Sequence, residues 1–207
     1  GVFINLERSA DRRKRFIDSA TKQTGNCFGI TTEKERKTGK IERIEAVDGK
    51  TVKSTIKGVT DNEYACIQSH LKALKYAREN KLTCIAIFED DILFSDTFEK
   101  DFKYYLSVMP VDWHILYLGG SFGRRPSYFD EHFTQQNMTW GAFAYVVHEK
   151  AYDELINMFS RANKIADAIL IEYQKKYICI KPNKKLVIHP KGFSTIKEIE
   201  VDYKHIQ

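Results

Sequence analysis

The sequence predicts an α/β fold in which helices cover both faces of a mainly parallel sheet. Strand-like apolar runs alternate with helical patterns along most of the chain, as in layered α/β domains. Residues 82–88 are mostly apolar and partly β-branched, which is typical of a central strand covered on both faces. The 207 residues suit one domain, so we expect a single domain over residues 1–207. The chain opens in a strand-like run without Met, so we expect residue 1 to lie at or near the domain edge.

In the first half of the chain, the clearest element is a helix that begins after Thr60. Thr60 and Glu63 have the spacing of a capping box, in which both side chains accept hydrogen bonds from unpaired backbone N–H groups. Apolar residues then recur at helical spacing as far as Asn80. A second helix is expected from Ser9 to about Thr24. The other expected elements of this half are strands over residues 2–6 and 41–47, an exposed loop over 31–42 and a turn at 48–49.

The second half of the chain continues the alternation. Its expected elements are helices over residues 96–108, 149–159 and 166–175, and strands over 113–118, 140–147, 177–180 and 185–188. Residues 121–139 are polar and aromatic without periodicity, so we expect a loop there. A loop of that length in a compact domain often has a function or is mobile.

The composition excludes several classes of protein. Hydrophobic residues make up 43% and charged residues 29% of the chain, which excludes wholesale disorder. No apolar run approaches the roughly 20 residues that a membrane-spanning helix needs. The net charge of +5 suits a phosphate-bearing ligand, an anionic membrane surface or nucleic acid, or simply a lysine-rich solvated surface.

The four cysteines do not follow a metal-binding spacing. Cys27, Cys66, Cys84 and Cys179 include no CxxC pair. We expect free, buried thiols in a reducing compartment. Cys66 and His70 stand one helical turn apart, but no further soft ligand lies nearby in the sequence, so we do not expect a zinc site there.

Glu89-Asp90-Asp91, directly after the central strand, is the strongest local signal. Ligands of open α/β sheets collect at the carboxyl ends of strands. Three adjacent acids repel one another, which raises their pKa values unless a cation lies among them, and carboxylate oxygens suit Mg²⁺ or Mn²⁺. In an extended segment Glu89 and Asp91 share one face and Asp90 lies on the other. The alternative is a charged strand exit that binds nothing.

Three further side chains are candidates for chemistry. His70 flanks the apolar stripe of its helix and is either a core residue or a functional one. Asp167 is a lone acid in an apolar segment, which costs free energy without a partner, and is either an N-cap or a general base. His189 follows a late strand and is either a loop residue or a last contact to metal or phosphate.

These motifs, in this order, resemble glycosyltransferase family 25, the group that includes bacterial lipooligosaccharide galactosyltransferases and the collagen galactosyltransferases. The resemblance runs through nearly the whole chain, to about Ile196. The matching segments are Phe3–Ser9, Asp11–Arg13, Ala46–Gly49, Glu63–His70, Phe88–Asp91, Trp140–Tyr145 and Asp167. The helix with Cys66, Ser69 and His70, followed by the acidic triplet, is the most specific part.

The chain departs from the family pattern at three places. His114 follows Trp113 where an acid is common, His189 stands where glutamine is usual, and Thr195 follows Ser194 where Asp is usual. We expect these differences to affect the end of the site that selects the sugar, and not the residues that bind the nucleotide.

The resemblance implies a GT-A-like α/β/α fold and a UDP-sugar donor, UDP-galactose or UDP-glucose. The donor-binding residues that it implies are Asn5, Leu6, Arg8, Arg12, Asp48, Gly49, Ser69, His70 and Glu89. It implies Mn²⁺ or Mg²⁺ held by Asp91, Glu89 and His189. It also implies two catalytic carboxylates, Asp90 at the sugar hydroxyls and Asp167 as general base. The family resembles inverting enzymes, in which one displacement at the anomeric carbon needs one base on the acceptor hydroxyl.

Two other classes of protein remain open at this point. A metal-dependent phosphohydrolase or nuclease also uses clustered acids on an α/β sheet, and a catalytically dead nucleotide-sugar-binding module would keep the fold. For the transferase we expect a glycan, glycolipid or glycoprotein acceptor, as in lipopolysaccharide biosynthesis. We expect no nucleic-acid partner, because the basic stretches lack interleaved aromatic residues. We expect a cytoplasmic protein, with peripheral membrane association as an option.

Overall fold

A computed structural model of the chain describes residues 1–25, 27, 29–30, 40–122, 127–190, 192–194 and 199–201. Most of the loop expected over 31–42, part of the loop expected over 121–139, and Thr195 lie outside these residues. The strands form a nine-stranded sheet of order β2-β3-β1-β4-β11-β6-β12-β9-β8. Seven of the nine run in one direction, and β11 and β9 run against them. The predicted α/β fold with a mainly parallel sheet is confirmed.

The strands of the large sheet are short. They are β1 (Val2–Asn5), β2 (Gly29–Ile30), β3 (Lys40–Glu45), β4 (Cys84–Glu89), β6 (Ile115–Tyr117), β8 (Ser127–Tyr128), β9 (Phe133–Gln135), β11 (Ala144–His148) and β12 (Cys179–Pro182). Three small antiparallel pairs lie apart from it. They are β5 (Leu93–Phe94) with β13 (Val187–Ile188), β7 (Ser121–Phe122) with β10 (Thr139–Trp140), and β14 (Gly192–Ser194) with β15 (Ile199–Val201).

The helices follow the order predicted from the sequence. They are α1 (Ala10–Gln23), α2 (Asp61–Glu79), α3 (Phe98–Ser107), α4 (Tyr152–Ser160) and α5 (Ala166–Gln174), with a short 3₁₀ turn η1 (Glu149–Ala151) before α4. Helix α2 begins with the predicted capping box, in which Glu63 N donates to Thr60 Oγ1 at 3.2 Å and Thr60 N donates to Glu63 Oε2 at 2.8 Å. Asn80 is its C-cap, as expected. In the described part of the chain, no helix is long and apolar enough to cross a bilayer.

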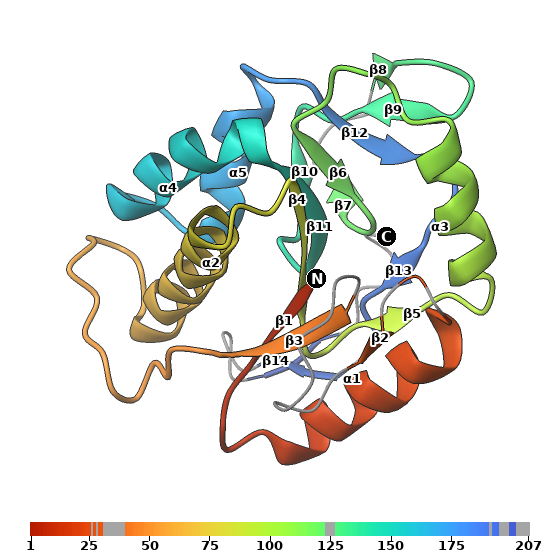
Figure 1. Ribbon diagram of the computed structural model, residues 1–207. Helices are drawn as coiled ribbons and strands as arrows, with labels where there is room; N and C mark the ends of the chain where they lie inside the picture. The colour runs from red at the N-terminus through yellow and green to blue at the C-terminus, as the bar shows by residue number, and fades with distance from the viewer. Residues whose placement is uncertain are drawn as a thin grey trace.

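The large sheet separates two hydrophobic cores. Along β4, Ile85 and Ile87 point to one core, and Ala86 and Phe88 point to the other, because side chains alternate along a strand. Helices α2, α4 and α5 cover the first face and α1 and α3 cover the second (Figure 1). The result is the three-layer α/β/α arrangement that the resemblance implies.

Two segments differ from the sequence prediction. The segment expected as a loop over 121–139 contains four strands, β7 to β10, of two or three residues each. Strands this short show no alternation of apolar and polar residues, so their sequence does not reveal them. The strand expected over 140–147 is divided into β10 and β11, because Gly141 takes a φ of +99° that a regular ladder does not accommodate.

The prediction of free thiols is confirmed, but the prediction that they are buried is only partly right. All four cysteines are free; Cys179 is buried, Cys27 and Cys66 are partly exposed, and Cys84 is exposed. Cys84 is the first residue of β4 and the only exposed residue of that strand.

Candidate active site

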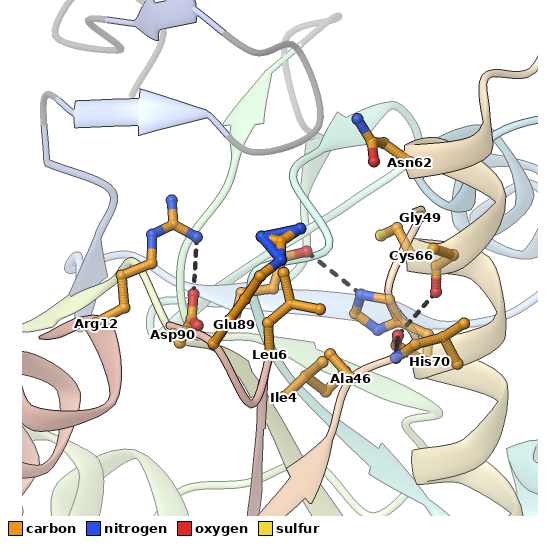
Figure 2. A pocket seen from close by; sticks show the side chains of 14 residues that line it. Ile4, Leu6, Arg12, Ala46, Gly49, Asn62, Cys66, His70, Glu89 and Asp90 are labelled. Carbon is orange, nitrogen blue, oxygen red and sulfur yellow. Dashed lines mark hydrogen bonds and ion pairs between the residues drawn. The ribbon is translucent and has the colours of Figure 1, made fainter. Parts of the chain in front are cut away.

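A pocket opens at the carboxyl ends of β1, β3 and β4, beside α2. These three strands are parallel neighbours, so their ends and the segments that follow them meet at one edge of the sheet. The lining residues are Ile4, Leu6, Arg8, Arg12, Ala46, Val47, Gly49, Asn62, Ala65, Cys66, Ser69, His70, Glu89 and Asp90 (Figure 2). The pocket encloses about 570 Å³, open solvent included. This place is typical of a small-molecule site in an open α/β sheet.

The three acids after β4 point in two directions. Strand β4 ends at Glu89, and Asp90 and Asp91 lie in the turn that follows. Glu89 Oε1 lies 3.3 Å from His70 Nε2, toward α2. Asp90 and Asp91 both face Arg12 of α1, which donates to Asp90 Oδ1 at 2.9 Å and to Asp91 Oδ2 at 3.0 Å. The expectation that Glu89 and Asp91 share a face is therefore wrong, because the alternation of an extended chain stops where the turn begins.

Asp90 is buried and held from two sides. Besides Arg12, Asn5 Nδ2 donates to Asp90 Oδ2 at 2.6 Å, and Asn5 Oδ1 in turn accepts from Arg43 Nε at 3.1 Å. Burial raises the pKa of Asp90 to about 6, while the charge of Arg12 acts in the opposite direction. The Asp90 carboxyl group therefore titrates closer to neutral pH than the carboxyl group of an exposed aspartate does.

Asp91 and His189, two of the three residues expected to hold a metal ion, form a partly buried pair. His189 Nε2 lies 3.2 Å from Asp91 Oδ1. Burial acts to raise the pKa of Asp91, but the imidazole of His189 and the guanidinium of Arg12 hold it below its ordinary value. A carboxylate oxygen and an imidazole nitrogen that converge in this way fit Mn²⁺ or Mg²⁺. Glu89, the third expected ligand, is turned toward His70 instead.

His70 is fixed at both ends of its ring. The ring is 1% exposed; Nδ1 lies 2.8 Å from the hydroxyl oxygen of Tyr145 and Nε2 faces Glu89. The neighbouring Ser69 Oγ accepts from Val47 N at 2.9 Å, so α2 is tied to the segment after β3. The sequence left open whether His70 is a core or a functional residue; its ring is buried, and its Nε2 edge reaches the pocket.

Arg8 and Gly49 also line the pocket, and Asp48 lies beside them. Arg8 donates to both carboxylate oxygens of Asp48, from Nε at 2.8 Å and from Nη2 at 3.0 Å. Gly49 lies directly against α2: a Cβ atom at this position would come within 2.1 Å of Asn62 Oδ1 and 2.9 Å of Asn62 Cα. Leu6 adds apolar surface to the lining.

Asp167 lies in the first turn of α5 and is not its N-cap, which is Ile165. Asp167 Oδ1 accepts a hydrogen bond from Ala142 N at 2.8 Å. Burial raises the pKa of Asp167, and the backbone hydrogen bonds from Ala142 and Gly141 act against that rise. Phe143 O accepts from Glu89 N at 2.8 Å, so the segment 141–143 joins Asp167 to the end of β4.

Two residues of the site were not predicted. Cys66 lines the pocket beside His70, and burial raises the pKa of its thiol well above the ordinary value. Tyr145 is fully buried and contacts the His70 ring. The helical spacing of Cys66 and His70 was a usable signal for the first. For Tyr145 there was none, because its position depends on how β11 pairs with β4.

Comparison with known proteins gives one informative match. The sequence matches the family "Glycosyltransferase family 25 (LPS biosynthesis protein)" over residues 2–125. None of the curated proteins matches the sequence.

Solved structures resemble the chain only distantly. An apo UDP-glucose pyrophosphorylase aligns at 10% identity and a TM-score of 0.39, over 69% of this chain and 55% of that chain, or about half of that protein's length. The protein A197 from STIV aligns at 8% identity and a TM-score of 0.47, over 100% of this chain and 95% of that chain. An active-site mutant of LgtC aligns at 13% identity and a TM-score of 0.46, over 86% of this chain and 71% of that chain. The family match, in contrast, spans more than half of the chain and includes α2 and the acids after β4, and the chain therefore belongs to glycosyltransferase family 25.

Proposed function

We propose that this glycosyltransferase moves a hexose, galactose or glucose, from a UDP-sugar to a hydroxyl group of a glycan acceptor, with inversion and with the help of a divalent ion. One observation carries the proposal: a single pocket brings Arg8 and Arg12 together with Glu89 and Asp90. Guanidinium groups bind phosphate oxygens in a two-pronged geometry, and carboxylates bind the ion that a diphosphate needs.

The donor would lie along the wall that runs from Gly49 to Arg12. The uracil ring would lie near Leu6, Gly49 and Asn62, which line this part of the pocket. Arg8 is placed at the mouth, and Arg12 at the acids, so both can contact the diphosphate. Asp91 and His189 would hold the ion, which, when bound, stabilises negative charge on the departing diphosphate.

The acceptor reacts on the side of Asp167. In the transfer, the acceptor oxygen bonds to the anomeric carbon while the bond from that carbon to the diphosphate breaks, and the hydroxyl proton goes to Asp167. A base with a raised pKa holds such a proton well, and burial raises the pKa of Asp167. The backbone hydrogen bond from Ala142 keeps the carboxylate in one orientation. Asp90 would bind hydroxyl groups of the donor sugar.

The acceptor class is a glycan, glycolipid or glycoprotein, and the family's description as an LPS biosynthesis protein favours a lipid-linked glycan. Free thiols in the described part of the chain support a reducing compartment, in keeping with a cytoplasmic enzyme. Peripheral association with a membrane would bring the enzyme to such an acceptor.

A thermal-shift panel tests the proposal. UDP, UDP-galactose, UDP-glucose and the corresponding ADP and GDP compounds are each added with and without Mn²⁺. We expect stabilisation by a UDP-sugar that grows with ligand concentration and requires the ion. Absence of stabilisation by every nucleotide-sugar would contradict the proposal. Release of phosphate from simple esters without an acceptor would indicate a phosphohydrolase, and donor binding without transfer would indicate a binding module.

A further inference from the structure

Three metal-ligating side chains meet in the pocket apart from Asp91 and His189. The thiol sulfur of Cys66, an imidazole nitrogen of His70 and a carboxylate oxygen of Glu89 all lie within 4.8 Å of one another. Cys66 and His70 are one turn apart on α2, and Glu89 reaches them from the end of β4 (Figure 2). All three line the pocket, so the group is open to small solutes.

The separation between His70 and Glu89 suits two ligands of a tetrahedral ion. Bonds of about 2.0–2.1 Å at tetrahedral angles place neighbouring N and O ligands about 3.3 Å apart. His70 Nε2 and Glu89 Oε1 are already separated by 3.3 Å. With Cys66 as the third ligand, one coordination position remains, on the side of the pocket.

Tyr145 gives His70 the support that a metal-binding histidine requires. Its hydroxyl lies 2.8 Å from His70 Nδ1 and can either donate or accept a hydrogen bond. In the tautomer that carries its proton on Nε2, His70 donates to Glu89 and accepts from the Tyr145 hydroxyl. When an ion binds Nε2, the ring proton is on Nδ1 instead. Nδ1 then donates to the Tyr145 hydroxyl, and the lone pair of Nε2 is available to the ion.

We propose that Cys66, His70 and Glu89 form a second divalent-ion site, which takes a thiophilic ion such as Zn²⁺ and keeps one open coordination position toward the pocket. The thiolate distinguishes this site from Asp91 and His189, whose oxygen and nitrogen donors suit Mn²⁺ or Mg²⁺. Binding releases the thiol proton of Cys66. The inference depends on these three side chains and not on the identity of the sugar donor.

Co²⁺ is the probe, because a thiolate bound to it produces an intense near-ultraviolet charge-transfer band. We expect the full-length chain to show this band at one equivalent of Co²⁺ and to lose it when Zn²⁺ is added. Cys66→Ser should abolish the band. Cys84→Ser removes an exposed thiol and should leave the band unchanged. A band that survives in the Cys66 variant, or that disappears in the Cys84 variant, overturns the proposal.

Two further variants test whether Co²⁺ binding depends on Tyr145 and whether it is independent of Asp91. Tyr145→Phe removes the hydrogen bond to His70 and should weaken Co²⁺ binding about 10–100-fold. Asp91→Asn changes the other pair and should leave the band in place. Unchanged affinity in the Tyr145 variant, or loss of the band in the Asp91 variant, contradicts the assignment.

A measurement on the unmodified protein does not depend on the folding of any variant. Alkylation of Cys66 and Cys84 by iodoacetamide is followed by peptide mass spectrometry with Zn²⁺, with Mg²⁺ and without added metal. We expect Zn²⁺ alone to slow alkylation of Cys66 at least tenfold, while Cys84 reacts at the same rate throughout. Equal Cys66 rates with and without Zn²⁺ would overturn the proposal.

Discussion

His189 Nε2 lies 3.2 Å from Asp91 Oδ1, and a pair of two-residue strands brings the two together. Strand β5 begins two residues after Asp91, and β13 ends just before His189; in the ladder, Ile188 pairs with Leu93. One half of the proposed metal site therefore depends on a small sheet that is separate from the large one.

We expect Asp91→Ala to abolish Mn²⁺-dependent binding of UDP and UDP-sugars and to leave the fold intact. The variant removes the carboxylate of the pair, so the ion loses the stronger of its two ligands. Titration calorimetry with UDP, with and without Mn²⁺, measures the loss, and circular dichroism checks the fold. Asp153→Ala, at an exposed position of α4, is the matched control. An unchanged affinity for UDP and Mn²⁺ in Asp91→Ala would remove the metal assignment.

We expect Asp167→Asn to keep donor binding and to lose transfer, by about 10²–10⁴-fold in kcat. The amide oxygen can still accept the hydrogen bond of Ala142 N, but the amide cannot take the acceptor proton. Radiolabelled sugar transfer measures kcat, and a UDP thermal shift measures binding. Glu172→Gln changes an acid elsewhere on α5 and should have no effect on either. Turnover close to that of the unmodified enzyme would show that another group is the base.

We expect Arg8→Ala to weaken UDP binding about tenfold or more, because a hydrogen bond to a charged group contributes about 1.5–3 kcal/mol. Thermal stability should change little, since Arg8 and Asp48 form a largely exposed ion pair. Arg78→Ala removes a similar exposed pair, with Asp153, and serves as control for both measurements. Equal UDP affinity in the two variants would exclude Arg8 from the donor site.

The buried Lys181 should make stability depend on pH above neutrality. Burial lowers the pKa of its ammonium group to about 8, whereas the unfolded chain titrates this group near the ordinary value of about 10.4. Between these values the unfolded chain binds more protons, so stability rises with pH, by about 3 kcal/mol at most.

Lys181→Met should remove this rise and stabilise the protein most below pH 8. Urea unfolding between pH 7 and pH 10.5 measures the difference from the unmodified chain. Lys175→Met, at an exposed position, should show a pH profile parallel to that of the unmodified protein. If the free energy of unfolding of Lys181→Met changed with pH in parallel with that of the unmodified protein, the predicted contribution of Lys181 would be wrong.

Local signals in the sequence located the elements of the fold. The capping box of Thr60 and Glu63 defines the start of α2, and the apolar run before Glu89 defines β4, because both depend on residues a few positions apart. The reversal of β11 could not be predicted in this way. An apolar strand reads the same in either direction, and only the pairing of Ala144 with Phe88 fixes its orientation.

The charged residues that line the pocket could be selected from the sequence, but their arrangement could not. The acidic triplet, His70 and the arginines after β1 all lie at the predicted edge of the sheet. The division between Glu89 and Asp91 depends on the residue at which β4 ends, and the approach of His189 depends on two-residue strands. Cys66, His70 and Glu89 converge only because α2 packs beside the end of β4, which a spacing rule along the chain does not capture.

The segment 141–143 has a consequence for the geometry of transfer. Phe143 O holds the backbone of Glu89 and Ala142 N holds the carboxylate of Asp167, so two adjacent residues link the donor-side acid to the proposed base. In the proposed transfer, the distance between these two carboxylates would therefore depend on the backbone of residues 141–143 and not on the pocket rim.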